Sequence, residues 1–255
     1  MAALLSIADI RLRLFEAYCA AAGLDVSVLG QPGISIAGER DRSGSGVVSA
    51  YELDRHLVLR CDPAVVEWCR RYVTPDLDPT VAGFESALPD EADRLGRGFV
   101  HVLADVDSDP DPHVRGLVKT DDADVALISA LTEADPEGAE DAEIELDALD
   151  AHAVGIEVDG ALAAFASERP WDTDPSFADI GVLTHPDHRK RGLAAAAVRE
   201  LSRGVLAAGR FPLYRCNATN IASKSLAEGV GFVEVVRLSA AIPSPPSVTP
   251  SEPHS

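Results

Sequence analysis

Several features are scarce in this sequence of 255 residues, beginning with long apolar stretches. No run approaches the roughly 18–20 consecutive apolar residues that a membrane-spanning helix needs, which excludes an integral membrane protein. A signal peptide needs an unbroken apolar stretch, and Asp9, Arg11 and Arg13 interrupt the N-terminal segment where that stretch would lie. Aromatic residues make up only 5% of the chain, so the core must be built mainly from Ala, Val, Leu and Ile. We therefore expect a cytoplasmic protein with an aliphatic core.

Cysteine is also sparse, and its spacing excludes two kinds of site. The chain has 4 cysteines, which form no CxxC pair and no Cys/His pattern typical of zinc. A chain of this length does not need disulfides to stabilise a core, so reduced thiols are expected. The sequence thus predicts no metal centre.

Positive charge is the third scarcity, because 22 basic residues face 42 acidic ones and give a net charge of -20. Lysine occurs only at Lys119, Lys190 and Lys224. A surface of this kind repels nucleic acid and anionic lipid, so neither is an expected partner. The composition leaves the oligomeric state open.

The chain divides where its composition changes. Residues 107–113 (DSDPDPH) are acidic and rich in proline, and they predict a linker between an N-terminal region, residues 1–106, and a domain over residues 114–242. The tail over residues 243–255 is too rich in Pro and Ser to pack, which predicts disorder.

The N-terminal region alternates between helical and strand patterns without a motif that assigns its function. Apolar periodicity predicts elements at residues 7–22, 56–60, 63–73 and 99–106. Residues 30–46 hold a short apolar segment and a Gly/Ser loop with a GxG pattern. We interpret it as a plain loop, because a phosphate-binding loop needs a strand before it and a helix after it.

The order of elements over residues 114–240 predicts a mixed α/β sheet with helices packed against it. Asp159-Gly160 between two apolar runs predicts a hairpin. Residues 193–208 carry an apolar stripe at helical spacing. Residues 133–148 are strongly acidic, and we interpret them as a solvated loop with a short helix.

One segment combines features that favour an anionic ligand. A strand predicted over residues 177–184 is followed by HPDHRKRGLA, and a long helix begins near Gly192. The first amides of a helix are unpaired and carry partial positive charge, and glycine lets a phosphate approach the backbone closely. Residues 189–191 (Arg-Lys-Arg) are the densest basic cluster in this acidic chain. The alternative is an ordinary charged turn before a helix.

A second segment lies at the next strand–helix junction. Asn220 and Ser223 stand at positions i and i+3 of a predicted helix start, so both can face one ligand. Leu226 and Gly231-Phe232 complete an N-x-x-S-x-x-L-x-x-x-x-G-F pattern. The alternatives are helix capping by Asn220 and a plain core position for Phe232.

The order and spacing of the two segments resemble those of the GCN5-related N-acetyltransferase (GNAT) superfamily. The resemblance extends over about residues 114–240 and depends on a strand that ends before Pro186, the Arg-x-x-Gly-x-Ala pattern of residues 189–194, and the pattern of residues 220–232. It implies an α/β fold with a mixed, largely antiparallel sheet flanked by helices. Residues 1–106 would then be either an accessory α/β region or a degenerate GNAT-like half.

The resemblance also implies that acetyl-CoA binds between two splayed parallel strands, residues 177–184 and 212–217. Backbone groups of the first strand would pair with the pantetheine arm, amides of residues 189–194 would hold the pyrophosphate, and two residues of the second segment would contact the cofactor's other side. The cofactor-binding residues implied in this way are Val182, Leu183, Thr184, Arg189, Lys190, Arg191, Gly192, Leu193, Ala194, Asn220 and Ser223.

The sequence departs from the family pattern at the catalytic positions. Ala227 stands where many members have a tyrosine proposed to protonate the leaving thiolate, and Arg215 stands where some have a glutamate base. Candidate bases from the sequence are Asp179, Glu168 and His185, and we single out Asp179. Tyr214 is the candidate proton donor, provided that it faces the cleft. If position 227 also faces the cleft, Ala227→Tyr is expected to raise the rate.

The expected function is therefore transfer of an acetyl group from acetyl-CoA to an amine on a small molecule or a protein. One alternative is an acyl-CoA-binding or regulatory module with weak catalysis, which Ala227 and Arg215 favour. A further alternative is an interaction protein whose residues 1–106 bind a partner. The sequence leaves the acceptor open.

Overall fold

The computed structural model describes residues 5–118, 120–144 and 152–243 and divides the chain into two compact units. Unit 1 consists of residues 1–18 and 98–236, and unit 2 of residues 19–97 and 237–255. This division differs from the one expected from composition. The helix at residues 7–18 groups with the C-terminal part of the chain, and the expected linker lies inside unit 1. The tail beyond Pro243 lies outside the described residues.

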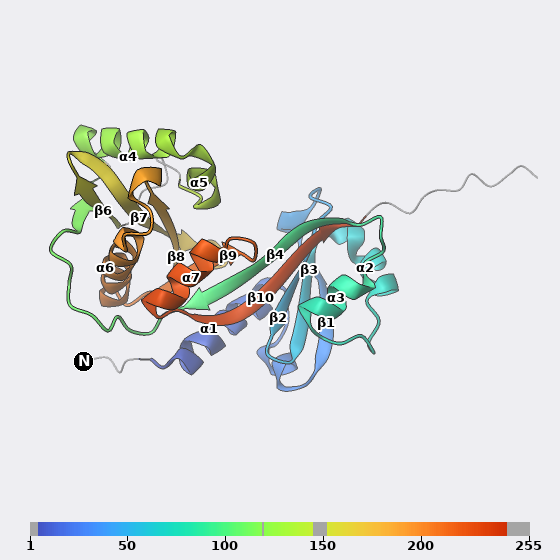
Figure 1. Ribbon diagram of the computed structural model, residues 1–255. Coiled ribbons are helices and arrows are strands. Elements are labelled where there is room, and N and C mark those ends of the chain that lie inside the picture. Colours follow the sequence, from blue (N-terminus) through green and yellow to red (C-terminus); the bar gives the residue numbers. More distant parts are fainter. Residues whose placement is uncertain (1–4, 119, 145–151, 244–255) are drawn as a thin grey trace, which may run out of the picture. The chain divides into compact units, whose positions relative to one another are not determined.

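Unit 1 is a mixed sheet covered by helices (Figure 1). Its helices are α1 (Ile7–Ala21), whose last turn belongs to unit 2, α4 (Asp122–Ala134), α5 (Pro136–Asp141), α6 (Leu193–Ala207) and α7 (Ile221–Val230). Its strands are β4 (Asp93–Val102), which begins in unit 2, β5 (Arg115–Leu117), β6 (Ala153–Val158), β7 (Ala161–Trp171), β8 (Asp174–Thr184) and β9 (Phe211–Asn217). The strand order is β4-β9-β8-β7-β6-β5. Neighbours pair antiparallel except β8 and β9, which are parallel, so the expected mixed, largely antiparallel sheet is confirmed.

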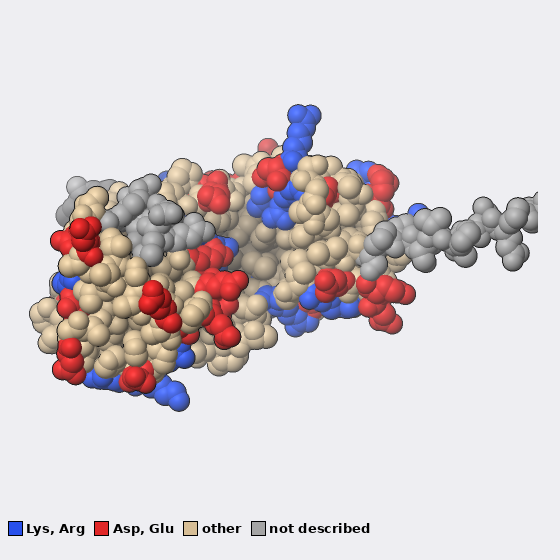
Figure 2. Space-filling view, turned by 90° about the horizontal axis from the view of Figure 1, so that it is seen from above, with Lys and Arg blue, Asp and Glu red and all other residues tan. Residues whose placement is uncertain are grey.

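The alternation of side chains along the strands gives unit 1 two cores. On β7, Phe165 packs into a cluster with residues of α4 and α5, whereas the next residue, Ala166, packs into a cluster with residues of α6 and α7. Successive residues of a strand point to opposite faces, so one strand serves both layers. The α4/α5 face and the α6/α7 face of the sheet are therefore distinct environments. Acidic side chains are scattered over the surface seen in Figure 2.

Local sequence signals correspond to observed turns in unit 1. Asp159 and Gly160 join β6 to β7 with φ values of 53° and 82°, as a two-residue hairpin with both central residues in the left-handed region requires. Asp121 caps α4 by accepting from the amides of Ala123 and Asp124. The predicted hairpin is confirmed.

Unit 2 is a smaller α/β layer. Its strands are β1 (Gly33–Gly38), β2 (Val48–Leu53), β3 (His56–Cys61) and β10 (Val233–Ile242), which begins in unit 1, in the order β1-β3-β2-β10. Its helices are α2 (Val66–Tyr72) and α3 (Val81–Ala87), with short 3-10 turns at Val26–Gly30, Arg40–Arg42 and Pro63–Val65. The sheet packs its apolar face against α2 and α3. Among the helices that the structure describes, none has the length and apolar character needed to cross a bilayer.

The glycine-rich loop of unit 2 is closed by its own chain. Asp62 Oδ2 accepts from the amides of Gly44 at 2.8 Å and Gly46 at 2.9 Å, and its Oδ1 accepts from the amide of Ala64 at 2.9 Å. The backbone hydrogen bonds from Ala64 and Gly46 hold the pKa of Asp62 below its ordinary value. A carboxylate thus takes the amides that a phosphate would need, which agrees with a plain loop at this position.

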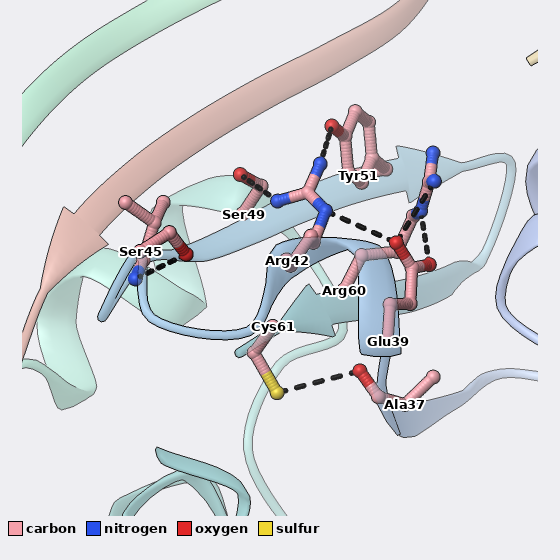
Figure 3. A network of polar contacts seen from close by, with 9 residues as sticks. Ala37, Glu39, Arg42, Ser45, Ser49, Tyr51, Arg60 and Cys61 are labelled. Atoms are coloured by element: carbon pink, nitrogen blue, oxygen red, sulfur yellow. Dashed lines mark hydrogen bonds and ion pairs between the residues drawn. The ribbon is translucent and has the colours of Figure 1, made fainter. Parts of the chain in front are cut away.

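The other face of the unit 2 sheet carries a polar network (Figure 3). Glu39 accepts from Arg60 Nε at 2.5 Å and Nη2 at 3.0 Å, and from Arg42 Nε at 3.0 Å. Arg42 also donates to Ser49 Oγ at 3.1 Å and to the Tyr51 hydroxyl at 3.3 Å. Glu39 and Arg60 are each only 7% exposed, so the ion pair between them is buried. The network around it connects the turn after β1 to strands β2 and β3.

Candidate functional site

The site is created by two strands of unit 1 that start as neighbours and then separate. β8 and β9 pair at Phe177 with Phe211, Ala178 with Pro212 and Asp179 with Leu213. Past Asp179, the described residues of these two strands form no further pair with each other. Meanwhile β8 continues to pair with β7 on its other side up to Thr184. Among the described strands, none pairs with the edge of β8 that faces the gap from Ile180 to Thr184.

A cavity of about 720 Å³ opens at this gap, entirely within unit 1. The structure brings every cofactor-binding residue expected from the sequence, together with Asp179 and Tyr214, to its lining. Glu168 also lines the cavity, whereas His185 does not belong to the lining. The expected residues come from three separated stretches of sequence, and the fold collects them around one space.

One end of the cavity is the turn between β8 and α6. Gly192 is the N-cap of α6 with a φ of 79°, and no side chain caps the first amides of the helix. Lys190 also has a positive φ, 60°. A Cβ built on Gly192 would meet nothing within 4 Å, so the space in front of these amides is open. Uncapped helix amides beside an open space are suited to a phosphate group.

Two basic side chains of this turn, those of Arg189 and Arg191, already have partners. The Arg189 guanidinium forms an ion pair with Asp135, the N-cap residue of α5, and its Nε lies 3.4 Å from the Thr184 carbonyl oxygen. Arg191 Nη1 lies 2.7 Å from His188 Nδ1. The contact between Arg189 and Asp135 attaches the turn to α5, a link that the sequence did not indicate.

The α7 side of the cavity carries a hydroxyl pair. The Tyr214 hydroxyl and Ser223 Oγ lie 2.9 Å apart, and Asn220 Oδ1 caps α7 by accepting from the Ser223 amide at 3.0 Å. Tyr214 is 2% exposed and packs against Phe232. Burial raises the pKa of Tyr214 to about 12, and the Ser223 hydroxyl partly opposes that shift. Tyr214 therefore keeps its proton at neutral pH.

Ala227 does not face the cavity. It is fully buried in the core between the sheet, α6 and α7, and its carbonyl oxygen accepts from the amides of Gly231 and Phe232. A tyrosine there would overfill a packed core, which destabilises proteins. The condition for the expected gain from Ala227→Tyr, that position 227 faces the cleft, is therefore not met.

The α4/α5 face of the cavity is dominated by two arginines and two carboxylates. Asp179 is 7% exposed and accepts from Arg215 Nη2 at 2.5 Å and Nε at 3.1 Å, and from Arg169 Nη2 at 3.4 Å. Glu143, in the turn after α5, contacts both guanidinium groups and lies 3.0 Å from Arg215 Nη2. Arg215 thus binds the carboxylate of Asp179 from the position where the family pattern can have a glutamate.

Glu168 is held on the opposite face of the sheet. Its Oε1 accepts from Arg210 Nη1 at 2.8 Å and lies 3.4 Å from His152 Nδ1. Its Oε2 is buried and has no hydrogen-bond partner among the described residues. His185 has a local role, because its Nδ1 accepts from the Asp187 amide at 3.2 Å.

Sequence reasoning missed Arg169, Glu143 and Asp135 as parts of this site. The last two belong to the acidic segment that we interpreted as a solvated loop with a short helix. The short helix is α5 (Pro136–Asp141), and it forms one wall of the cavity together with its flanking residues Asp135 and Glu143. The only local signal for Arg169 was its place at the end of a strand. No property of residues 133–144 by themselves reveals that arginines from β7 and β9 lie opposite.

Residues 160–240 match the family model for the GNAT acetyltransferase. This part of the chain is a GNAT acetyltransferase domain. The match extends from β7 into β10 and includes the divergence of β8 and β9, the Gly192 turn, and α7. A comparison with curated proteins gives no match.

Solved GNAT structures resemble parts of the chain. A GNAT-family acetyltransferase structure from Novosphingobium aromaticivorans is 25% identical over 62% of this chain and 70% of its own, with a TM-score of 0.46. The yncA structure from Salmonella typhimurium, solved with acetyl-CoA, is 18% identical over 50% of this chain and 90% of its own, with a TM-score of 0.40. A tandem GNAT protein of clavulanic acid biosynthesis is 20% identical over 66% of this chain, with a TM-score of 0.45. The chain spans only 59% of that protein's length.

Proposed function

We propose that this GNAT domain binds acetyl-CoA and transfers its acetyl group to the amine of an acceptor. The main observation behind the proposal is that two features line the same cavity one after the other. The edge of β8 that has no strand partner among the described residues is followed directly by the uncapped helix amides at Gly192. An amide-bearing chain such as pantetheine can pair with a free strand edge. A pyrophosphate can then accept from helix amides at the end of that edge. The yncA structure contains acetyl-CoA, which agrees with this assignment.

The chemistry requires one carbon–nitrogen bond to form while the thioester carbon–sulfur bond breaks. An acceptor ammonium must lose one proton before it attacks, and a second proton must pass to the departing thiolate. We propose that Asp179, which lies where β8 and β9 diverge, accepts the proton from the ammonium. We propose that the Tyr214–Ser223 hydroxyl pair, on the other side of the gap, donates the proton to the thiolate. Donors and acceptors placed in this way contribute about 10²–10⁴-fold each to comparable reactions.

A catalytically weak acyl-CoA-binding module is a second candidate, because Ala227 is buried where many family members place a tyrosine. Two measurements on the full chain separate the candidates: calorimetric binding of CoA, and release of free thiol from acetyl-CoA with a panel of amines. Binding together with amine-dependent thiol release supports the transferase. Binding without thiol release above the amine-free blank supports the module, and absence of binding contradicts both.

A further inference from the structure

Four charged side chains converge at the α4/α5 face of the cavity. Arg169 and Asp179 are directly paired across β7 and β8, Arg215 projects from β9, and Glu143 comes from the turn after α5. All four line the cavity. Two guanidinium groups and two carboxylates thus meet beside the point where β8 and β9 separate.

The two carboxylates differ in how firmly they are held. The Asp179 side chain is 8% exposed, stands on a strand and accepts from both arginines. The Glu143 side chain is 49% exposed and stands on a turn residue with a φ of 50°. Ion pairs that reach solvent are individually weak, so the contact of Glu143 is readily exchanged for another carboxylate.

The arginines are suited to such an exchange. Their side chains are 32% and 34% exposed, which leaves them reachable from the cavity. A guanidinium binds a carboxylate through parallel N–H donors, with a geometry that an amide or an alcohol cannot match. If the Glu143 carboxylate leaves, Arg169 and Arg215 each lose one carboxylate contact, which an incoming carboxylate can replace.

We propose that the acceptor is an amine that carries its own carboxylate close by, as an amino acid does. Its carboxylate takes the place of Glu143 on Arg169 and Arg215, and its ammonium lies against Asp179. This inference rests on the proposed function, because it names the acceptor class for the same cavity. Glu143 occupies the carboxylate position when the acceptor is absent.

Calorimetric titration tests this arrangement without requiring turnover. Individual L-amino acids and the matching L-amino-acid α-amides are titrated into the full chain, both free and saturated with CoA. The amide keeps the amine and removes only the negative charge. We expect amino acids to bind and their amides to bind at least about tenfold more weakly, as expected when a charged hydrogen-bonding partner is lost.

Three variants assign the effect to the residues named. Arg169→Met should weaken amino-acid binding about tenfold or more. Arg169→Lys should bind amino acids more tightly than Arg169→Met but more weakly than the wild type, because lysine keeps the positive charge but cannot donate two parallel hydrogen bonds to a carboxylate. Glu143→Gln should tighten binding about two- to fivefold, because an exposed internal competitor is removed. Glu67→Gln is the matched control: its side chain is 82% exposed in unit 2, so it changes the net charge equally without touching the cavity.

The outcomes separate this inference from the proposed function. Amides that bind as well as amino acids, or failure of amino acids to bind both the wild type and Glu143→Gln, would overturn it. Equal effects of Glu143→Gln and Glu67→Gln would also overturn it, because general charge would then explain the change. CoA binding is measured separately, and its loss would contradict the proposed function instead.

Discussion

Gly192 offers the sharpest test of where the pyrophosphate of CoA meets this chain. A side chain at this position would project into open space directly in front of the first amides of α6, since its Cβ has no neighbour within 4 Å. In Gly192→Asp, a negative charge would therefore stand where a phosphate must approach. Two unit charges about 4 Å apart repel by roughly 4 kcal/mol at the effective dielectric of a protein surface.

The open site and the neighbouring basic residues screen part of this repulsion. We therefore expect the free energy of CoA binding to weaken by about 3 kcal/mol, which corresponds to roughly 10²-fold in affinity. The substitution also lowers stability: Gly192 has a φ of 79°, and a residue with a Cβ costs about 1–2 kcal/mol in the left-handed region.

Gly192→Asn is the matched control, because asparagine has nearly the same shape and tolerates the same backbone conformation. Calorimetry with CoA and thermal melts are measured for the wild type and both variants. We expect equal losses in melting temperature, and CoA binding at least about tenfold weaker for Asp than for Asn, with a gap that narrows as salt is raised. Folded variants that bind CoA as well as the wild type would refute the assignment of the pyrophosphate to this turn.

Four further predictions follow from named contacts. Asp179→Asn should lower kcat/KM about 10²-fold with CoA affinity nearly unchanged, and wild-type rates in this variant would eliminate Asp179 as the base. Tyr214→Phe should lower kcat about 10²-fold while the thermal melt shows the variant folded, and an unchanged kcat would remove Tyr214 as the proton source. Glu39→Ala should destabilise unit 2 by about 3 kcal/mol in urea melts, because it removes the buried carboxylate that accepts from buried Arg60; a loss no larger than that of exposed Glu67→Ala would contradict this. The hydrogen bond from Arg115 holds the pKa of Asp124 below its ordinary value, so its contribution to stability is present above about pH 4 and is lost as the pH falls further; urea melts from pH 7 to 3 should show a shallower loss for Asp124→Asn, and parallel curves would contradict it.

The division between local and long-range interactions explains which parts of the site the sequence could predict. The Gly192 turn, the cap at Asn220 and the Asp159-Gly160 hairpin depend on residues a few positions apart, so their signals are readable in a short window. Arg215 forms ion pairs with two residues that are distant in sequence: Asp179 lies 36 positions away and Glu143 lies 72 positions away. No periodicity or motif spans such a distance. The acidic segment that supplies Glu143 therefore resembled a solvated loop.

The sequence by itself determined the layered α/β arrangement of unit 1, the glycine at the start of α6, and the set of residues expected around a CoA-like ligand. Backbone conformation and helix capping depend on residues close in sequence, so the turn at Gly192 and the starts of the helices can be predicted from short segments. Only the tertiary structure decided that Ala227 is buried in the core, that Tyr214 meets Ser223, and that Asp179 lies between two arginines. Which face of a strand meets the cavity depends on how helices distant in sequence pack against the sheet, and that packing places Arg169, Asp179 and Arg215 on the α4/α5 face.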